Sequence, residues 1–362
     1  MTDHLHVAVA LDGYGWHPEA WRHTPDIEPV TSGRHWSGLA TTAERGLLDF
    51  VTFDDALTAQ RRRRAEIEPR WLAGRPDAVL VASRVAPVTN HIGLIPVATV
   101  THTEPFHVSK AIATLDFVSR GRAGWQVRVS GTAHEAELFG RRDIRAADLF
   151  DEASDAVEVV RRLWDSWEDD AVIRDVVTGR FVDRDKLHYI DFTGKYFSVK
   201  GPSITPRPPQ GQPVVAALAH ALPIYEFASR SADLVFVTPQ DDDSLLAILG
   251  EIARAGGAAL KVYADVFVSF DGTTDPRSDA VVFGGTPTEL VEVLLRWQEH
   301  GIEGVRLRPA INATDLPVIV DEVVPLLQRA GRFRTAYTDG ETLRERLGLP
   351  VAENRYARVE PS

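Results

Sequence analysis

The chain alternates, along nearly its whole length of 362 residues, between short apolar runs and segments whose apolar residues recur at helical spacing. Runs that are apolar throughout are typical of parallel strands with both faces covered, and a strand followed by a helix is the repeating unit of α/β proteins. Eight strands are predicted, at residues 6–11, 48–53, 91–100, 122–131, 214–219, 234–237, 260–270 and 304–307. Eight strand–helix pairs predict a (β/α)8 TIM barrel, whose active site lies at the carboxyl ends of the strands.

A helical segment follows each of these strands. The predicted helices lie at residues 36–46, 76–85, 106–118, 145–167, 225–230, 244–254, 288–300 and 316–330. The unit at residues 105–130 is the clearest, because Pro105 suits a first helical turn and residues 119–121, Ser-Arg-Gly, end the helix before the next strand. That strand also contains Arg122, Trp125 and Gln126, which are not generic core residues. These residues indicate a strand with a more specific role than core packing. The alternative interpretation is a well-packed strand in which the two glycines occur by chance.

The main alternative fold is an open doubly wound sheet, which needs a glycine-rich phosphate turn after its first strand. Residues 11–21, Leu-Asp-Gly-Tyr-Gly-Trp-His-Pro-Glu-Ala-Trp, do not supply that turn, and the barrel is preferred. A single domain over residues 1–362 is expected, with an insertion at about 168–212 between the fourth helix and the fifth strand. This segment is too long for an ordinary connection. An active-site lid or dimer contact and a simple surface flap both remain open for it.

Charge and composition exclude several classes of protein. A net charge of −12 argues against nucleic acid and anionic membranes as partners, which favour basic surfaces. The absence of cysteine rules out disulfides, cysteine-bound zinc, iron–sulfur clusters and thiol nucleophiles. No basic segment followed by a long apolar one begins the chain, and no apolar run reaches membrane-spanning length. A cytoplasmic location is therefore expected.

Polar residues collect where the predicted strands end. They are Asp12, His17, Asp54, Asp55, Thr99, His102, Gln126, Ser130 and His220. Their spacing matches no metal motif, and no nucleophile elbow is present, so a polar rim around an apolar mouth indicates binding of a flat cofactor. His17 and His102 are the candidate catalytic residues, although a lone histidine is more often structural. The basic run at residues 61–64 is expected at the surface, with contact to an anionic cofactor tail as a minor alternative.

Several motifs resemble those of the luciferase-like flavin-dependent monooxygenases, in the branch that oxidises nitrilotriacetate, alkanes and dibenzothiophene sulfone. They are LDFVTFDDAL at residues 48–57, TLDFVSRGRAGWQVRVSG at 114–131, GTPTEL at 285–290 and the tail at 323–349. The resemblance implies a (β/α)8 barrel with an insertion. It also implies reduced FMN from a separate NAD(P)H-dependent flavin reductase, oxygen activation beside a small organic substrate, and a homo-oligomer.

The resemblance assigns cofactor-binding roles unevenly. Asp55, Thr99 and Gln126 match residues that approach the flavin ring, and Ser130 follows them on the same strand as Gln126. The residues expected around the FMN phosphate differ from the family pattern. The family usually has a His, a Tyr and a Ser-Ser pair there, and these positions fall on Ala146, Phe150, His220 and Ala221. His220, partly protonated near a helix amino terminus, is a substitute phosphate ligand. Weak FMN binding is therefore expected. A deazaflavin-dependent hydride-transfer enzyme and a non-catalytic flavin-binding relative remain alternatives.

Overall fold

Eight parallel strands close into a barrel in the computed structural model, which describes residues 4–24, 28–59, 67–141, 145 and 148–357. In order around the ring these are β1 (His6–Leu11), β2 (Phe50–Phe53), β3 (Gly93–Thr99), β4 (Gly124–Arg128), β9 (Val214–Leu218), β10 (Leu234–Val237), β11 (Lys261–Ser269) and β13 (Gly304–Pro309). The ring closes because β10 pairs with β11 and β13 pairs with both β11 and β1. The predicted (β/α)8 TIM barrel is confirmed.

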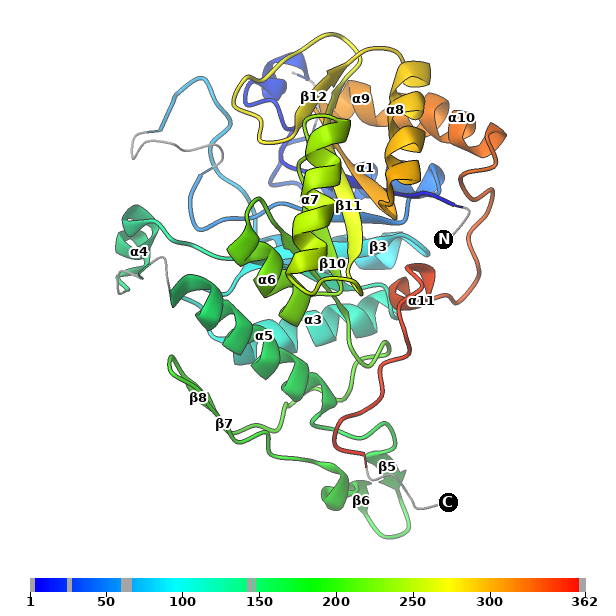
Figure 1. Ribbon diagram of the computed structural model, residues 1–362. Helices are drawn as coiled ribbons and strands as arrows, with labels where there is room; N and C mark the ends of the chain where they lie inside the picture. The colour runs from blue at the N-terminus through cyan, green and yellow to red at the C-terminus, as the bar shows by residue number, and fades with distance from the viewer. Residues whose placement is uncertain (1–3, 25–27, 60–66, 142–144, 146–147, 358–362) are drawn as a thin grey trace.

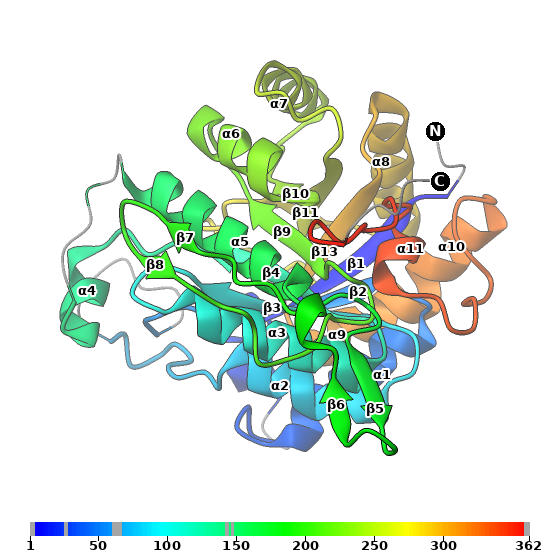
Figure 2. The ribbon, with the colours of Figure 1, turned by 90° about the horizontal axis from the view of Figure 1, so that it is seen from below.

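The helices form a layer around the strands (Figures 1 and 2). They are α1 (Gly33–Arg45), α2 (Ala78–Val85), α3 (Pro105–Ser119), α5 (Leu149–Asp165), α6 (Leu222–Ser231), α7 (Asp242–Arg254), α8 (Pro287–His300), and a run of α9 (Asn312–Val318), η5 (Ile319–Val323) and α10 (Val324–Arg329). The main core lies between this layer and the outer face of the barrel. Four short elements lie in the loops: η1 (Ala20–His23), η2 (Ala86–Val88), α4 (Ala133–Phe139) and β12 (Val281–Gly284). Strand β12 pairs in parallel with residues 266–269 at the carboxyl end of β11.

The α3–β4 unit shows how the sequence specifies a barrel repeat. Helix α3 ends at Arg120, which takes the left-handed conformation with φ of 58° and is followed by Gly121 with φ of 82°. The Arg122 side chain is buried and donates hydrogen bonds to the carbonyl oxygens of Ala86, Thr89 and Ile92. Arg122 therefore holds the connection between α2 and β3 against the start of β4, which is a structural role.

The amino-terminal end of the barrel is filled by side chains and closed by α11 (Leu343–Arg346). Leu343 and Leu347 are buried in one apolar cluster with Phe50, Ile95 and Tyr263 from the barrel strands. This plug leaves the carboxyl-terminal mouth as the end at which a ligand can enter the barrel.

The insertion lies outside the barrel, along α5 and beside the C-terminal segment (Figure 1). It contains two hairpins, β5 (Val172–Asp175) with β6 (Arg180–Val182) and β7 (Phe192–Thr193) with β8 (Ser198–Val199), and η4 (Arg184–Lys186) between them. Arg207 donates to Asp165 at the end of α5 and to the carbonyl oxygen of Ala352. The described part of the chain includes no helix that is both long enough and apolar enough to span a membrane.

Candidate active site

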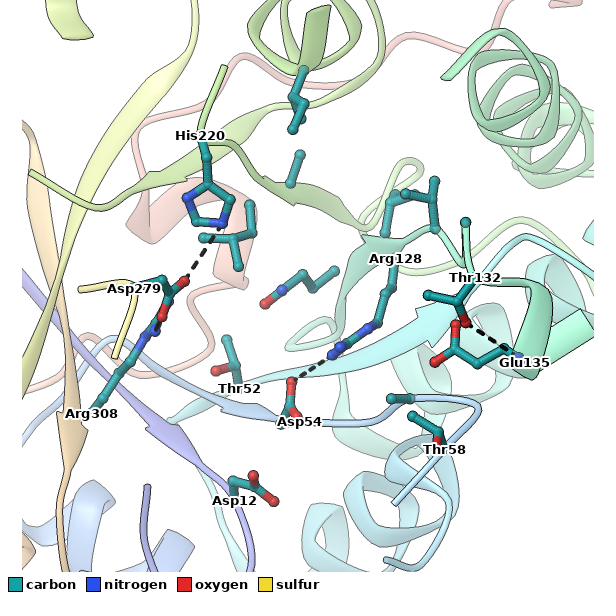
Figure 3. Close-up of a pocket in the computed structure, with 18 of the residues that line it drawn as sticks. Asp12, Thr52, Asp54, Thr58, Arg128, Thr132, Glu135, His220, Asp279 and Arg308 are labelled. Atoms are coloured by element: carbon teal, nitrogen blue, oxygen red, sulfur yellow. Dashed lines mark hydrogen bonds and ion pairs between the residues drawn. The ribbon is translucent and has the colours of Figure 1, made fainter. Parts of the chain in front are cut away.

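A cavity of about 540 Å³ occupies the carboxyl-terminal mouth of the barrel (Figure 3). Its walls come from the ends of β1, β2, β4, β9 and β13 and from the loops that follow them. The volume falls within the range of small-molecule sites, and this end of a (β/α)8 barrel is where such enzymes bind their substrates.

The cavity has one apolar side. Seven apolar residues form this side and come from β4, the loop after β4, α5, β9 and α6; they are Val127, Val129, Phe150, Ala217, Leu218, Ile224 and Phe227. Phe150 and Phe227 contact each other with ring centroids 5.8 Å apart. This side suits the apolar part of a flat aromatic ligand.

A first cluster of charges faces this apolar side from the end of β2. Asp54 accepts a hydrogen bond from Arg75 Nη1 at 2.6 Å and another from Arg128 Nη1 at 3.2 Å. Burial by itself would raise the pKa of Asp54, but the guanidinium groups of Arg75 and Arg128 outweigh it and hold that pKa below its ordinary value. Asp54 is therefore a carboxylate at neutral pH.

A second cluster forms the floor of the cavity. Asp265 of β11 accepts hydrogen bonds from Arg306 at 2.7 and 2.5 Å and is also bonded to Arg308. Arg306 Nη1 donates to Gln126 Oε1 at 2.7 Å, and its guanidinium lies 3.5 Å from the ring centroid of Phe236. Arg306 and Arg308 are both nearly inaccessible to solvent because alternate residues of β13 point into the barrel.

His220 stands at the rim above this floor. Its Nδ1 lies 3.0 Å from Thr238 Oγ1 and its Nε2 lies 3.5 Å from Asp279 Oδ2. Burial lowers the pKa of His220 below its ordinary value, which favours the neutral imidazole. This shift weakens the expectation that a partly protonated His220 binds the phosphate. Ala221 directly precedes α6, and no side chain among the described residues caps that helix.

The structure separates the residues that were expected to converge beneath one cofactor ring. Gln126 and His220 line the mouth cavity. Asp55 and Thr99 line a different pocket of about 340 Å³, together with residues of β3, α2, α3 and the loops beside them. Asp55 accepts hydrogen bonds there from the backbone N–H groups of Ala56 and Ala78, at 2.7 and 3.0 Å. The predicted convergence of Asp55 and Thr99 with Gln126 is wrong, since strand-end residues can point outward as well as into the mouth.

The remaining predicted residues lie at or beyond the edge of the cavity. Ser130 Oγ donates to Glu135, which lines the wall. His17 and His102 do not line the cavity: His17 Nδ1 accepts from the N–H of Glu19 at 3.3 Å, and the His102 ring stacks on Phe139. Their placement does not support a catalytic role. Ala146 and residues 61–64 fall outside the described residues.

Sequence reasoning missed the arginines of the site, which are Arg75, Arg128, Arg306 and Arg308. The sequence contains a sign of two of them, because Arg306 and Arg308 alternate with Val305 and Leu307 in an otherwise apolar strand. Asp265 likewise interrupts the apolar strand β11. Charges at inward positions of strands are expensive unless they are paired. Asp265 and Arg306 are register partners, which is a pairing that sequence order does not reveal. Among the described residues no group of three acidic, histidine or cysteine side chains could hold a metal ion.

A closed parallel barrel with a part-apolar, part-charged cavity at its mouth belongs to the class of enzymes that bind a small molecule there. The family model for luciferase-like monooxygenases matches residues 18–281, and the chain belongs to this family. The resemblance inferred from the motifs is confirmed, and the protein is an oxidoreductase of the monooxygenase type.

Similar proteins agree with this assignment. N-acetyl-S-(2-succino)cysteine monooxygenase of Bacillus subtilis (strain 168) is 29% identical over an alignment that covers 98% of each chain. Dibenzothiophene-sulfone monooxygenase of Rhodococcus erythropolis is 28% identical over 92% of this chain and 94% of its own. The crystal structure of a long-chain alkane monooxygenase has the same fold, with a TM-score of 0.83, 23% identity and 96% of each chain covered.

Proposed function

We propose that the protein is the oxygenase of a two-component system that binds reduced flavin in the mouth cavity and inserts oxygen into a small organic substrate. The observation that carries this proposal is the two-sided cavity, with an apolar wall from β4, β9 and α6 facing a wall of arginines and carboxylates. Several relatives of the chain are named as monooxygenases of small organic molecules.

The residues of the cavity fit a flavin ring. Isoalloxazine is flat, apolar at its dimethylbenzene end and rich in acceptors at its pyrimidine end. Arg75 Nε is buried in the wall and has no hydrogen-bond partner among the described residues, and a buried unpaired donor is costly until an acceptor reaches it. Arg75, Arg128 and Gln126 would hold the acceptor edge, and Phe150 and Phe227 would contact the apolar end.

The division of labour follows from this fit. When bound, the flavin supplies the oxygen chemistry. The side chains orient it, and the apolar wall excludes water from the reacting atoms. The region expected to bind the FMN phosphate has fewer hydrogen-bond donors, because the side chains of Phe150 and Ala221 offer none. FMN is therefore expected to bind weakly, and a deazaflavin is the alternative cofactor.

Titration of the purified protein with FMN, anaerobically reduced FMN and a deazaflavin tests the proposal. We expect flavin absorbance and fluorescence to change on binding, and we expect reduced FMN to bind with the highest affinity of the three. Leu218→Trp should fill the space beside the apolar wall and abolish flavin binding. Leu222→Trp, at the exposed start of α6 and outside the cavity, is the matched control and should leave binding unchanged. A chain that is folded and binds none of the three cofactors would contradict the proposal, and preference for the deazaflavin would indicate hydride transfer.

The proposal includes a separate NAD(P)H:flavin reductase as the source of reduced FMN, a cytoplasmic location and a homo-oligomeric state. These remain predictions. Oxygen consumption that depends on adding a flavin reductase and NADH would support the two-component arrangement, and light scattering of the purified chain would measure its oligomeric state.

A further inference from the structure

Asp279 reaches from an outer loop to the floor of the cavity. It lies between β11 and β12, and its side chain is 47% exposed. Its Oδ1 nevertheless accepts a hydrogen bond from Arg308 Nη1 at 2.5 Å, and its Oδ2 lies 3.5 Å from His220 Nε2 (Figure 3). An exposed carboxylate thus pairs with an arginine whose own side chain is 1% exposed.

The charge balance of the floor explains why a carboxylate is needed at this point. Arg306 and Arg308 both pair with Asp265, so two buried positive charges share one buried negative charge. One further negative charge is required for neutrality, because an uncompensated buried charge is strongly destabilising. Asp279 supplies it from the loop.

Arg308 also retains unused hydrogen-bonding capacity. Its Nε is buried in the cavity wall without a hydrogen-bond partner among the described residues. Its guanidinium lies 4.6 Å from the ring centroid of Trp16, which is another residue of the wall. Since Arg308 also forms an ion pair with Asp265, its side chain would stay in place if Asp279 moved away.

We propose that a carboxylate of the substrate replaces Asp279 on Arg308, so that the enzyme selects small organic molecules that carry a carboxylate. This inference rests on the proposed function for its location in the flavin cavity. Exchange of one monoanion for another keeps the floor neutral. A phosphate dianion would leave an extra negative charge beside Asp265, which argues against the cofactor phosphate as the occupant.

The test uses benzoate and its uncharged isostere benzamide as probes, measured by calorimetry and by Trp fluorescence. Asp279→Asn removes the competing charge. We expect it to tighten benzoate binding about tenfold and to leave benzamide binding unchanged, because only the anion competes with Asp279. The matched control is Asp339→Asn, which makes the same charge change at a fully exposed position outside the cavity.

A second experiment tests the role of Arg308 with a double variant that keeps the net charge of the protein. Arg308→Gln alone would leave carboxylates unpaired in the floor of the cavity. The variant Arg308→Gln with Asp279→Asn should fold, as checked by circular dichroism and thermal unfolding. It should then bind benzoate no better than benzamide. Retained preference for benzoate in this variant would overturn the proposal.

Two further outcomes separate the anion sources and the two proposals. If Asp279→Asn tightens FMN but neither riboflavin nor benzoate, the anion is the cofactor phosphate, and the proposal is overturned. If no flavin binds to any folded variant but Asp279→Asn still tightens benzoate selectively, the carboxylate site stands and the flavin proposal fails. Equal benzoate affinity in the wild type and Asp279→Asn would overturn the carboxylate site alone.

Discussion

Asp54 and Asp55 are adjacent at the end of β2, yet their carboxylates serve different parts of the molecule. Asp54 lines the cavity and binds Arg75 and Arg128. Asp55 accepts the backbone N–H of Ala78 at the start of α2. Burial raises the pKa of Asp55, in contrast to the lowered pKa of Asp54. Successive side chains of an extended segment point in opposite directions, which accounts for the difference.

This pair gives a matched test at the residue scale. Asp55→Asn should lower the free energy of unfolding by about 1 kcal/mol through loss of charge-assisted bonds to backbone N–H groups, with the flavin dissociation constant unchanged. Asp54→Asn should weaken flavin binding about tenfold because Arg75 and Arg128 lose their anchor. Urea unfolding and flavin titration measure both. If Asp55→Asn instead impairs flavin binding at normal stability, the cofactor role assigned to Asp55 from the sequence is right.

At the scale of elements, the insertion at residues 168–212 leaves the barrel at the carboxyl end of α5. Helices of a (β/α)8 barrel run antiparallel to their strands, so this end lies away from the active-site mouth. All of residues 168–212 are described, and none of them lines the cavity. The lid interpretation receives no support from this placement. The surface interpretation, which the sequence left open, agrees with it.

Shortening the β5–β6 hairpin tests the two interpretations. Val176 and Val177 at its tip are more than nine-tenths exposed. Replacing residues 175–180 by two glycines should therefore leave the melting temperature nearly unchanged and should release no more hydrogen peroxide per NADH than the intact enzyme. Increased peroxide release would show that the hairpin protects the reaction from water and would restore the lid role.

The junction between α3, β4 and the segment after the insertion depends on one buried carboxyl group. Asp116 accepts hydrogen bonds from Gln210 N, Gln210 Nε2 and Ala123 N, at 3.0, 2.6 and 3.1 Å. Burial raises the pKa of Asp116 to about 6, and the hydrogen bonds reverse only part of that shift. The pKa of Asp116 in the folded protein is therefore well above that of an exposed aspartate.

This shift predicts a pH dependence of stability. Because the folded pKa is above the unfolded value of 3.8, the folded state binds the proton more tightly, and the resulting stabilisation is lost as pH rises through about 6. Relative to Asp116→Asn, the wild type should lose about 1 kcal/mol of unfolding free energy between pH 5 and pH 7. Urea unfolding of both proteins at the two values measures it. Parallel pH profiles would contradict the assignment.

At the scale of the whole molecule, the C-terminal segment completes the barrel rather than trailing from it. Leu343 and Leu347 fill the amino-terminal end of the lumen, and Arg346 donates to the carbonyl oxygens of Asp49 and His91 from two neighbouring strand–helix units. Residues distant in sequence thus close the end opposite to the site.

Leu343→Ala should lower the free energy of unfolding by roughly 2–5 kcal/mol, because it leaves a cavity among rigid barrel side chains. Leu349→Ala, at a partly buried position beside the same cluster, is the control and should cost less. Chemical denaturation measures the two changes. Equal small losses would show that the lumen is stable without the plug.

Much of the fold could be predicted because its signals are local. Apolar runs such as 6–11 and 214–219 and the end of α3 at Arg120 depend on neighbours along the chain, and the structure places strands and a helix end there. Among the site residues, Gln126 and His220 were identified as strand-end residues that face the mouth. Asp55 and Thr99 were misplaced, because strand-end position does not determine the direction of a side chain.

The sequence by itself determined the eight strand–helix units, the barrel they form and the family to which the chain belongs. Tertiary structure alone decided which charges meet. Asp265 finds Arg306 only because β11 and β13 become neighbours, and Asp279 reaches Arg308 across a distance of 29 positions in the chain. Buried charges are stable only with partners, and barrel closure brings those partners together from strands far apart in the sequence.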